Sequence, residues 1–317
     1  MDSDIGAAAF AALTSTSIYE TGITFTKKEH KKPYPTIFPS RPELSQAGRT
    51  VLITGGSAGI GFAIAKGFAQ AHAKRIIILG RRRNLVDEAV SELKKEFPQV
   101  QFDGYSSDVD DLADVEKLWK GFEEDGTVID VLVLNAAKVS EHGPILSLGR
   151  DEVWSSFTMN VRSLLDLSEK FYKQKNGEGR QKVCKFLVNV STEASHNFTK
   201  SGPWPAYSAS KNAGTMLIQM IAKDTPPEKM QVLNFHPGVV HTSAFKNAGI
   251  PEDIYPFDHV DLAGNFAVWA ASEEARFLHG RFVWAKWDID ELKSGVIGEK
   301  IQNNDHYLKV GVVGLQE

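Results

Sequence analysis

Short apolar runs alternate with longer segments of helical periodicity along most of the chain, and this alternation restricts its fold more than any other feature. The apolar runs are short enough for strands, and their near-continuous hydrophobicity is typical of strands buried on both faces of a sheet. Strands that alternate with helices form right-handed βαβ units and a parallel sheet. The expected strands include 51–53, 76–79, 131–134 and 186–190, and the expected helices include 62–71, 85–97 and 115–122.

We therefore predict an α/β fold with a Rossmann-like, doubly wound parallel sheet in three α/β/α layers. The length of 317 residues would by itself suggest two domains, but α/β domains of about 250 residues are common and no internal repeat divides the chain. We expect one domain over residues 48–290, an N-terminal extension over 1–47 and a C-terminal extension over 291–317. The C-terminal extension is expected to pack on the domain or on a partner subunit.

The two extensions differ in composition. Residues 27–42 are rich in Lys, His and Pro, which favours an extended arm and is most simply interpreted as a solvated linker. The C-terminal extension carries Leu292, Val296, Ile297 and Ile301, so part of it is expected to be helical. Its apolar run at 310–315 is expected to pack against the body or a partner.

Charge and composition exclude several classes of function. The 36 Lys and Arg against 40 Asp and Glu give a net charge of −4, so we expect neither a nucleic-acid nor a membrane partner. No apolar run approaches the ~20 residues that span a bilayer, and the acidic start MDSD does not resemble a targeting peptide. We expect a cytoplasmic location. The single cysteine, Cys184, cannot form an intramolecular disulfide and is expected to be unreactive.

A glycine-rich segment, TGGSAGIG at 54–61, joins the first expected strand to the first expected helix. Its glycines permit a tight turn and close approach of a pyrophosphate, which the helix N-terminus stabilises. Gly80 then ends the second strand, where NAD-preferring folds of this kind carry an acidic residue. Arg81 follows and can bind a 2′-phosphate, so we predict NADP(H). The alternative is that the arginines at 81–83 only cap a helix start that is exposed to solvent.

An ordered set of short motifs follows successive strands, and chance would have to place each one after the correct strand. The set consists of TGxxxGxG at 54–61, Asn135-Ala-Ala, Ser191, Tyr207-xxx-Lys211 and Pro237-Gly238. It resembles the short-chain dehydrogenase/reductase family over residues 50–284, with Ala137 in place of the glycine of the family's Asn-Ala-Gly segment.

The resemblance implies that residues 48–290 form an NADP(H)-binding catalytic domain. The cofactor contacts that it implies, together with those predicted above, are Gly55, Ser57, Gly59, Ile60, Gly61, Arg81, Asp108, Val109, Asn135, Tyr207, Lys211, Pro237, Gly238, Val239 and Thr242.

Reduction of a carbonyl group requires a proton donor and polarising hydrogen bonds, and Tyr207 is the candidate general acid. A free phenol has a pKa of about 10. Lys211 lies one helical turn away, and its charge is expected to favour the phenolate. We expect Ser191 to orient the substrate oxygen. Asn160 resembles the family's helix asparagine, which holds a water that links the lysine to solvent.

The loops beyond the strands are expected to select the substrate, with His196, Trp204 and Phe245 as candidate contacts. No metal site is expected, because His236 and His241 lack further ligands at suitable spacing. The expected activity is NADPH-dependent reduction of a ketone or aldehyde on a hydrophobic small molecule, with aromatic and polyketide-like compounds as candidates.

Two alternatives remain open at this point. One is a non-catalytic NADP(H)-binding regulator or scaffold. The other is a dehydratase, epimerase or bifunctional pathway enzyme that uses the same acid–base groups. The resemblance also implies a homodimer or homotetramer formed through the helices that carry Asn160 and Tyr207.

Overall fold

The central element is a seven-stranded parallel sheet with the order β3-β2-β1-β4-β5-β6-β7. The computed structural model describes residues 24–175, 184–197, 201–202, 204–242, 245–246 and 251–312. The chain winds outward in both directions from β1 and β4, so the predicted doubly wound sheet is confirmed. The strands are β1 Thr50–Thr54, β2 Arg75–Gly80, β3 Gln101–Ser106, β4 Val131–Leu134, β5 Lys185–Val190, β6 Met230–His236 and β7 Phe282–Trp284.

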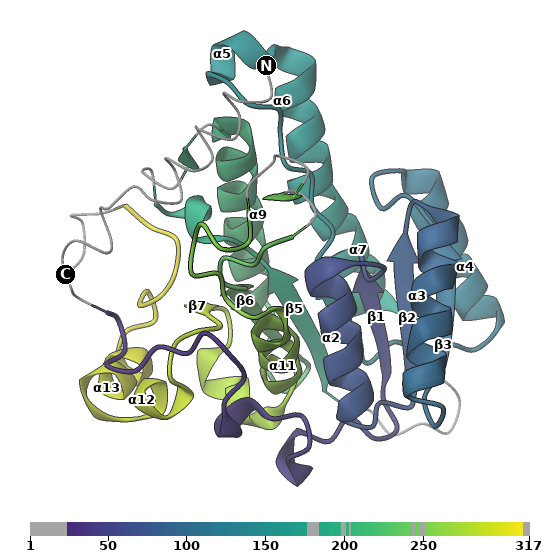
Figure 1. Cartoon of the computed structure of the whole chain (residues 1–317), viewed down its shortest axis with the longest axis horizontal. Coiled ribbons are helices and arrows are strands. Elements are labelled where there is room, and N and C mark those ends of the chain that lie inside the picture. Colours follow the sequence, from purple (N-terminus) through teal and green to yellow (C-terminus); the bar gives the residue numbers. More distant parts are fainter. Residues whose placement is uncertain are drawn as a thin grey trace.

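Helices cover both faces of the sheet (Figure 1). Alternate strand residues serve the two cores: in β1, Val51 and Ile53 pack on one side and Leu52 on the other. This arrangement confirms the three-layer prediction. One face carries α2 Gly59–Gln70, α3 Arg83–Glu96 and α11 Val260–Ala270; the other carries α4 Leu112–Glu124, α7 Ser163–Lys173 and α9 Pro205–Lys223.

Several shorter elements shape the edge of the sheet at which β1, β4, β5 and β6 end. Between β4 and α7 the chain forms two short helices and a π-helical turn, a form of backbone often found at functional sites. These elements are α5 Ile145–Leu148, α6 Arg150–Phe157 and the π turn η3 Thr158–Arg162; a 3₁₀ turn, η4 Glu193–Ser195, follows β5.

The N-terminal arm is not the solvated linker that its composition suggested. Tyr34, Ile37 and Leu44 are buried in the core, and the Phe25 ring stacks on Trp287 with centroids 4.2 Å apart. Prolines begin two 3₁₀ turns, η1 Pro35–Ile37 and η2 Pro42–Leu44, which is where a fixed φ is favourable. Burial of these few apolar side chains fixes the arm on the domain, although most residues of the arm are polar.

The arm runs along the C-terminal part of the chain, as the purple and yellow segments of Figure 1 show. Glu29 forms an antiparallel bridge with Trp287. His30 Nε2 lies 2.9 Å from Asp288 Oδ2, and the Lys27 amide donates to the Glu291 carboxylate at 2.7 Å. These contacts join two segments that are almost the whole chain apart in sequence.

The C-terminal extension is partly helical, as expected, with α12 Ile289–Lys293 and α13 Gly295–Asn303. A further 3₁₀ turn, η5 Glu273–Leu278, precedes β7. In β7, the Phe282 amide donates to the Leu308 carbonyl at 2.8 Å. The Val310 amide donates to Gln219 Oε1 of α9 at 3.0 Å. The rest of the predicted apolar run, from 313 onward, lies outside the described residues.

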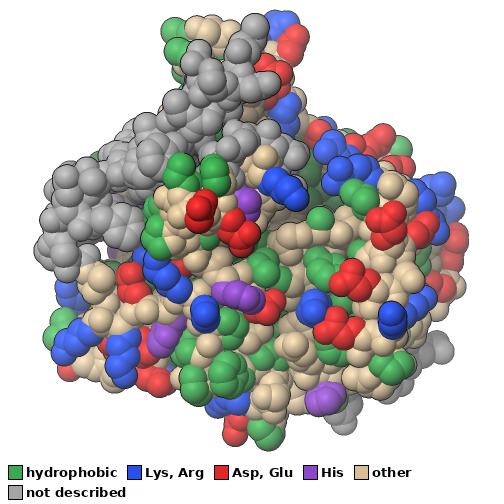
Figure 2. Space-filling model, in the orientation of Figure 1, with side chains coloured by type: hydrophobic (Ala, Val, Ile, Leu, Met, Phe, Trp, Pro, Cys, Tyr) green, Lys and Arg blue, Asp and Glu red, His purple; other side chains and the backbone are tan. Residues whose placement is uncertain are grey.

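The surface is mixed in character. Figure 2 shows basic and acidic side chains interspersed over the face in view. Within the described ranges, no helix combines the length and the apolar character needed to cross a bilayer.

Candidate active site

The glycine-rich turn between β1 and α2 leaves no room for a side chain at Gly61. Gly55 has a φ of +64°, and a Cβ on Gly61 would lie 2.3 Å from the Gly55 carbonyl oxygen. Asn135, at the end of β4, donates from Nδ2 to that same carbonyl at 3.1 Å and so holds the turn. The N-cap residue of α2, Ala58, supplies no side-chain cap. The first amide groups of α2 are therefore open to an anion.

The end of β2 excludes the acidic residue of NAD-preferring sites. A Cβ on Gly80 would lie 2.9 Å from Val86 Cγ2 and 3.2 Å from Ser57 Oγ. A carboxylate-bearing side chain at position 80 would therefore have to displace its neighbours. Ser57, from the glycine-rich turn, thus lies beside the position where a ribose 2′ substituent is expected.

Of the arginines that follow Gly80, Arg81 and Arg83 have different environments. Arg83 forms an ion pair with Asp87 one helical turn away, at 2.8 Å, which is the helix-start role considered above as an alternative. Arg81 is exposed and forms no ion pair with another described residue; its main-chain carbonyl accepts a hydrogen bond from Ser106 Oγ at 3.1 Å. Its guanidinium is available for a ligand.

The segment after β3 is compact. Asp108 Oδ1 accepts a hydrogen bond from the Asp110 amide at 3.1 Å, which makes a local turn. The Val109 side chain is buried with the core residues of α4. Both residues lie at the edge of the sheet where the other candidate cofactor residues gather, and the adenine contact remains a prediction.

Tyr207 and Lys211 lie on the first turns of α9, which begins at Pro205. The Lys211 Nζ donates to the Val190 carbonyl at 2.7 Å, and burial lowers the pKa of this amine to about 8. Burial raises the pKa of Tyr207 to about 12. The expected lowering of the phenol pKa is thus wrong for this form of the protein: desolvation disfavours the phenolate, and the lysine donates to the main chain.

The Thr192 side chain is the group whose influence acts to lower the pKa of Tyr207. Ser191 Oγ lies 2.6 Å from Thr215 Oγ1. Since Thr215 donates its proton to the Lys211 carbonyl at 2.8 Å, Ser191 is the donor in that pair. Ser191 lines the candidate substrate cavity, but its hydroxyl donates a hydrogen bond to Thr215 of α9.

The alternation along β5 explains this arrangement. Leu187 packs in the core on the α9 side of the sheet, and every second residue continues toward that side. Ser191 is therefore turned to α9, and Thr192 begins the η4 turn, accepting from the Ala194 amide at 3.3 Å. Strand alternation alone does not identify Thr192 from the sequence, because the η4 turn begins there.

Asn160 lies in the π turn η3 and is buried. Its Oδ1 accepts from the Lys138 amide at 2.9 Å, and its Nδ2 donates to the Lys138 carbonyl at 2.8 Å and to Ser210 Oγ at 2.9 Å. Both amide hydrogens are used, so the side chain ties the β4 loop to α9. The water relay expected for Asn160 remains a prediction.

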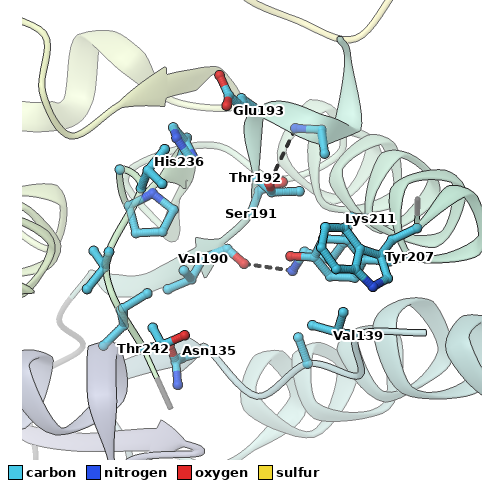
Figure 3. Close-up of a pocket in the computed structure, with 18 of the residues that line it drawn as sticks. Asn135, Val139, Val190, Ser191, Thr192, Glu193, Tyr207, Lys211, His236 and Thr242 are labelled. Atoms are coloured by element: carbon cyan, nitrogen blue, oxygen red, sulfur yellow. Dashed lines mark hydrogen bonds between the residues drawn. The ribbon is translucent and has the colours of Figure 1, made fainter. Parts of the chain in front are cut away.

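A cavity of about 340 Å³ lies beside Tyr207. Figure 3 shows Tyr207 and Lys211 on one side of it, with His236, at the end of β6, and Thr242 on the opposite side. Trp204 and Phe245, two of the candidate substrate contacts, also line it. The remaining lining residues are mostly apolar and include Ile60, Ala137, Val139 and Val240.

The third substrate candidate, His196, is not a lining residue of this cavity. Its ring packs edge-on against Phe282, with centroids 5.1 Å apart, because η4 ends at Ser195 and the next residue turns toward β7. Glu193 and His236 also line the cavity, although neither was among the predicted site residues. Burial lowers the pKa of His236 to about 3, so its imidazole is neutral. The position of Glu193 and His236 in the sequence could have identified them, since each lies close to a predicted motif.

The loop after β6, residues 237–242 (the β6 loop), forms the wall opposite Tyr207 with Pro237, Gly238, Val239 and Thr242. The Val239 amide donates to Asp258 Oδ2 at 2.8 Å, and the Asp258 amide donates back to the Val239 carbonyl at 2.8 Å. Among the described residues, no three His, Cys, Asp or Glu side chains are grouped as metal ligands.

Comparison with known proteins gives matches over most of the chain. The short chain dehydrogenase family model matches residues 49–253. The short chain dehydrogenase/reductase nsrO of Aspergillus novofumigatus is 31% identical over 94% of this chain and 99% of its own length. A short chain dehydrogenase/reductase of Claviceps purpurea is 32% identical over 95% of this chain and 98% of its own.

The fold has close counterparts among solved structures. L-sorbose reductase from Gluconobacter frateurii, solved with NADPH and L-sorbose, has a TM-score of 0.66 and 21% identity, over 80% of this chain and 100% of that chain. The relatives that align over nearly the whole chain and the family match over residues 49–253 show that this chain belongs to the short-chain dehydrogenase/reductase family of oxidoreductases.

Proposed function

We propose that the protein is an NADPH-dependent carbonyl reductase that converts a ketone or aldehyde on a hydrophobic small molecule to an alcohol. The observation that carries this proposal is the gathering of the Tyr207 phenol, the Lys211 amine and the Thr192 hydroxyl at one cavity. A proton donor, a cation that can renew its proton and a polarising donor are the groups that carbonyl reduction requires.

The residues present fit a dinucleotide cofactor. The bare turn at Gly55 and Gly61 and the uncapped start of α2 suit a pyrophosphate. The blocked space at Gly80, together with Ser57 and the exposed Arg81, favours a 2′-phosphate and hence NADP(H). The related L-sorbose reductase was solved with NADPH, which agrees with this choice. When bound, the nicotinamide would supply hydrogen to the substrate carbon together with its electron pair.

The side chains would handle the proton. Burial keeps Tyr207 protonated, with a pKa of about 12, so it is ready to give its proton to the carbonyl oxygen as charge develops there. The Thr192 hydroxyl, whose side chain already influences the pKa of Tyr207, would donate to the same oxygen in place of the predicted Ser191. Lys211 is mostly cationic at neutral pH with a pKa of about 8, and it would return the proton to Tyr207.

The cavity favours an apolar substrate of moderate size. A volume of about 340 Å³ lies at the lower end of the range for small-molecule sites. Val139, Trp204 and Phe245 supply apolar and aromatic walls, whereas Glu193 and His236 supply polar contacts. Aromatic ketones with a few polar substituents suit this lining.

The test is NADPH oxidation with a panel of aromatic and aliphatic ketones, followed by product analysis. Native protein is expected to consume one NADPH per alcohol formed, and Tyr207→Phe to lose nearly all activity. Equal rates for both proteins would refute the role of Tyr207. Product formation without net NADPH consumption would instead favour the dehydratase or epimerase alternative, and NADPH binding without turnover of any ketone would favour the non-catalytic one.

The same proposal includes a homo-oligomer that pairs through α7 and α9. Leu165 on α7 and Met216 and Met220 on α9 expose apolar side chains, and the two methionines are four residues apart and share a helix face. Light scattering is expected to give at least a dimer, and the double variant Met216→Lys, Met220→Lys is expected to shift it toward the monomer. A native monomer would contradict this part.

A further inference from the structure

The β6 loop is fixed by a carboxylate that lies outside the motifs. Asp258 and Val239 exchange two hydrogen bonds, both of 2.8 Å. Gly238 has a φ of +94°, and a Cβ there would lie 2.6 Å from Asp258 Oδ2. The carboxylate therefore packs directly on bare backbone near the start of the loop.

This carboxylate is buried, with 9% of the residue exposed. Burial raises its pKa, whereas the Val239 amide and the charges of Lys286 and Lys31 act in the opposite direction. A buried anion of this kind stays in place only when donors and cations compensate its lost hydration. The lysines that do so belong to segments far from the β6 loop in sequence.

The N-terminal arm holds the chain on both sides of Asp258. Lys31 Nζ donates to the Pro256 carbonyl at 2.9 Å, and the His259 amide donates to the Lys31 carbonyl at 2.7 Å. One residue of the arm thus binds the chain just before and just after the carboxylate.

The arm also holds the segment that anchors the start of the β6 loop. The Ala285 amide donates to the His236 carbonyl at 2.9 Å. The next residue, Lys286, pairs through Nζ with Glu29 at 2.8 Å, and its carbonyl accepts from the His30 amide at 2.8 Å. The residue before the loop, His236, and Val239 within it are therefore both connected to residues 29–31, through Ala285 and Lys286 and through Asp258.

We propose that Asp258 and arm residues 29–31 are positioning elements of the reductase, which fix the β6 loop in the form that receives the nicotinamide end of the cofactor. This inference rests on the proposed function for the role of the loop. All of these residues lie outside the region that the family model matches, residues 49–253. The residues of this positioning device therefore lie outside the matched region.

The experiment compares four variants of the full chain. Asp258→Ala removes the acceptor of the Val239 amide, Asp258→Asn keeps an acceptor without the charge, and Lys31→Met removes the donor to Pro256. Arg41→Gln is the matched control, because Arg41 pairs with Glu274 at 2.7 Å and so fixes the arm away from the loop.

Two readouts separate positioning from general stability. Loss of one hydrogen bond in the loop is expected to raise the NADPH Kd and KM about tenfold in Asp258→Ala with a much smaller change in kcat. Asp258→Asn is expected to stay within about threefold of native. Amide exchange of a peptide over residues 232–242, measured without cofactor, is expected to accelerate in Asp258→Ala and Lys31→Met and to stay native in Arg41→Gln.

Unchanged exchange in both Asp258→Ala and Lys31→Met would overturn the proposal, as would equal acceleration in Arg41→Gln. If Asp258→Ala does not fold, Asp258→Asn and Lys31→Met carry the same comparison. The exchange readout needs no cofactor, so it is independent of the proposed function. If the variants show the predicted exchange pattern but the native protein does not bind NADPH, the proposed function is refuted. The cofactor role of the loop is then refuted with it.

Discussion

Replacing Thr192 with valine, which has the same shape, removes the hydroxyl that influences Tyr207 and should lower kcat strongly. The loss of one donor to a developing oxyanion typically lowers kcat by about 10² to 10³, or ~2.7–4 kcal/mol. The variant also loses the cap that Thr192 supplies to the Ala194 amide at 3.3 Å, which costs about 1 kcal/mol of stability. Thr192→Ser keeps the hydroxyl and should restore most of the activity.

Ser191→Ala is the matched comparison. Ser191 is 3% exposed and donates to Thr215 at 2.6 Å, so its loss removes a buried hydrogen bond of about 1 kcal/mol. Since Ser191 is not the donor to the substrate, kcat should change by less than about threefold. The melting temperature should fall by about 2 °C.

The assay is steady-state NADPH oxidation with the best ketone from the panel, with thermal unfolding measured on the same samples. If Ser191→Ala loses more activity than Thr192→Val, the assignment of the hydrogen-bond donor is refuted. If Thr192→Ser is as inactive as Thr192→Val, the hydroxyl is not what matters at this position.

Three further predictions concern the cofactor and the proton. Arg81→Ala should weaken NADPH binding by about 10- to 100-fold and leave NADH binding nearly unchanged in a fluorescence titration, whereas Arg83→Ala, whose guanidinium pairs with Asp87, should change neither. The kcat of reduction should fall as the pH rises through about 8, because Lys211, whose pKa burial lowers to about 8, is neutral above that pH and cannot return a proton; a Lys211→Met profile that still shows this limb would assign it elsewhere. Gly61→Ala places a Cβ 2.3 Å from the Gly55 carbonyl and should destabilise the protein by about 1–3 kcal/mol in urea unfolding, and native NADPH affinity in this variant would contradict the close-approach argument.

The layered fold could be predicted because its signal is local. Each strand of the buried sheet is an apolar run, and runs such as 131–134 coincide with the observed β4, Val131–Leu134. The arm could not be predicted in the same way, because its stability comes from partners that lie beyond residue 250. Nothing near Tyr34 in sequence shows that its hydroxyl donates to the Trp287 carbonyl at 2.9 Å.

The candidate site was predictable in its motifs and less so in its geometry. The order of motifs placed Tyr207, Lys211 and the glycine-rich turn at one edge of the sheet, where they do lie. The position of the Thr192 side chain depends on the η4 turn, which begins there and which motif spacing does not reveal. The directions of the pKa shifts at Tyr207 and Lys211 depend on burial, which motif spacing does not reveal.

The contacts of the N-terminal arm also bear on the order in which the protein is made. Lys27, Glu29 and His30 bind partners that lie between 257 and 264 residues later in the chain. At roughly 5–20 residues per second, the ribosome needs about 13 to 50 s to reach those partners. The arm must therefore wait through most of translation before it can dock. The first of the described segments to be synthesised therefore makes these contacts only after the chain through Glu291 has been made.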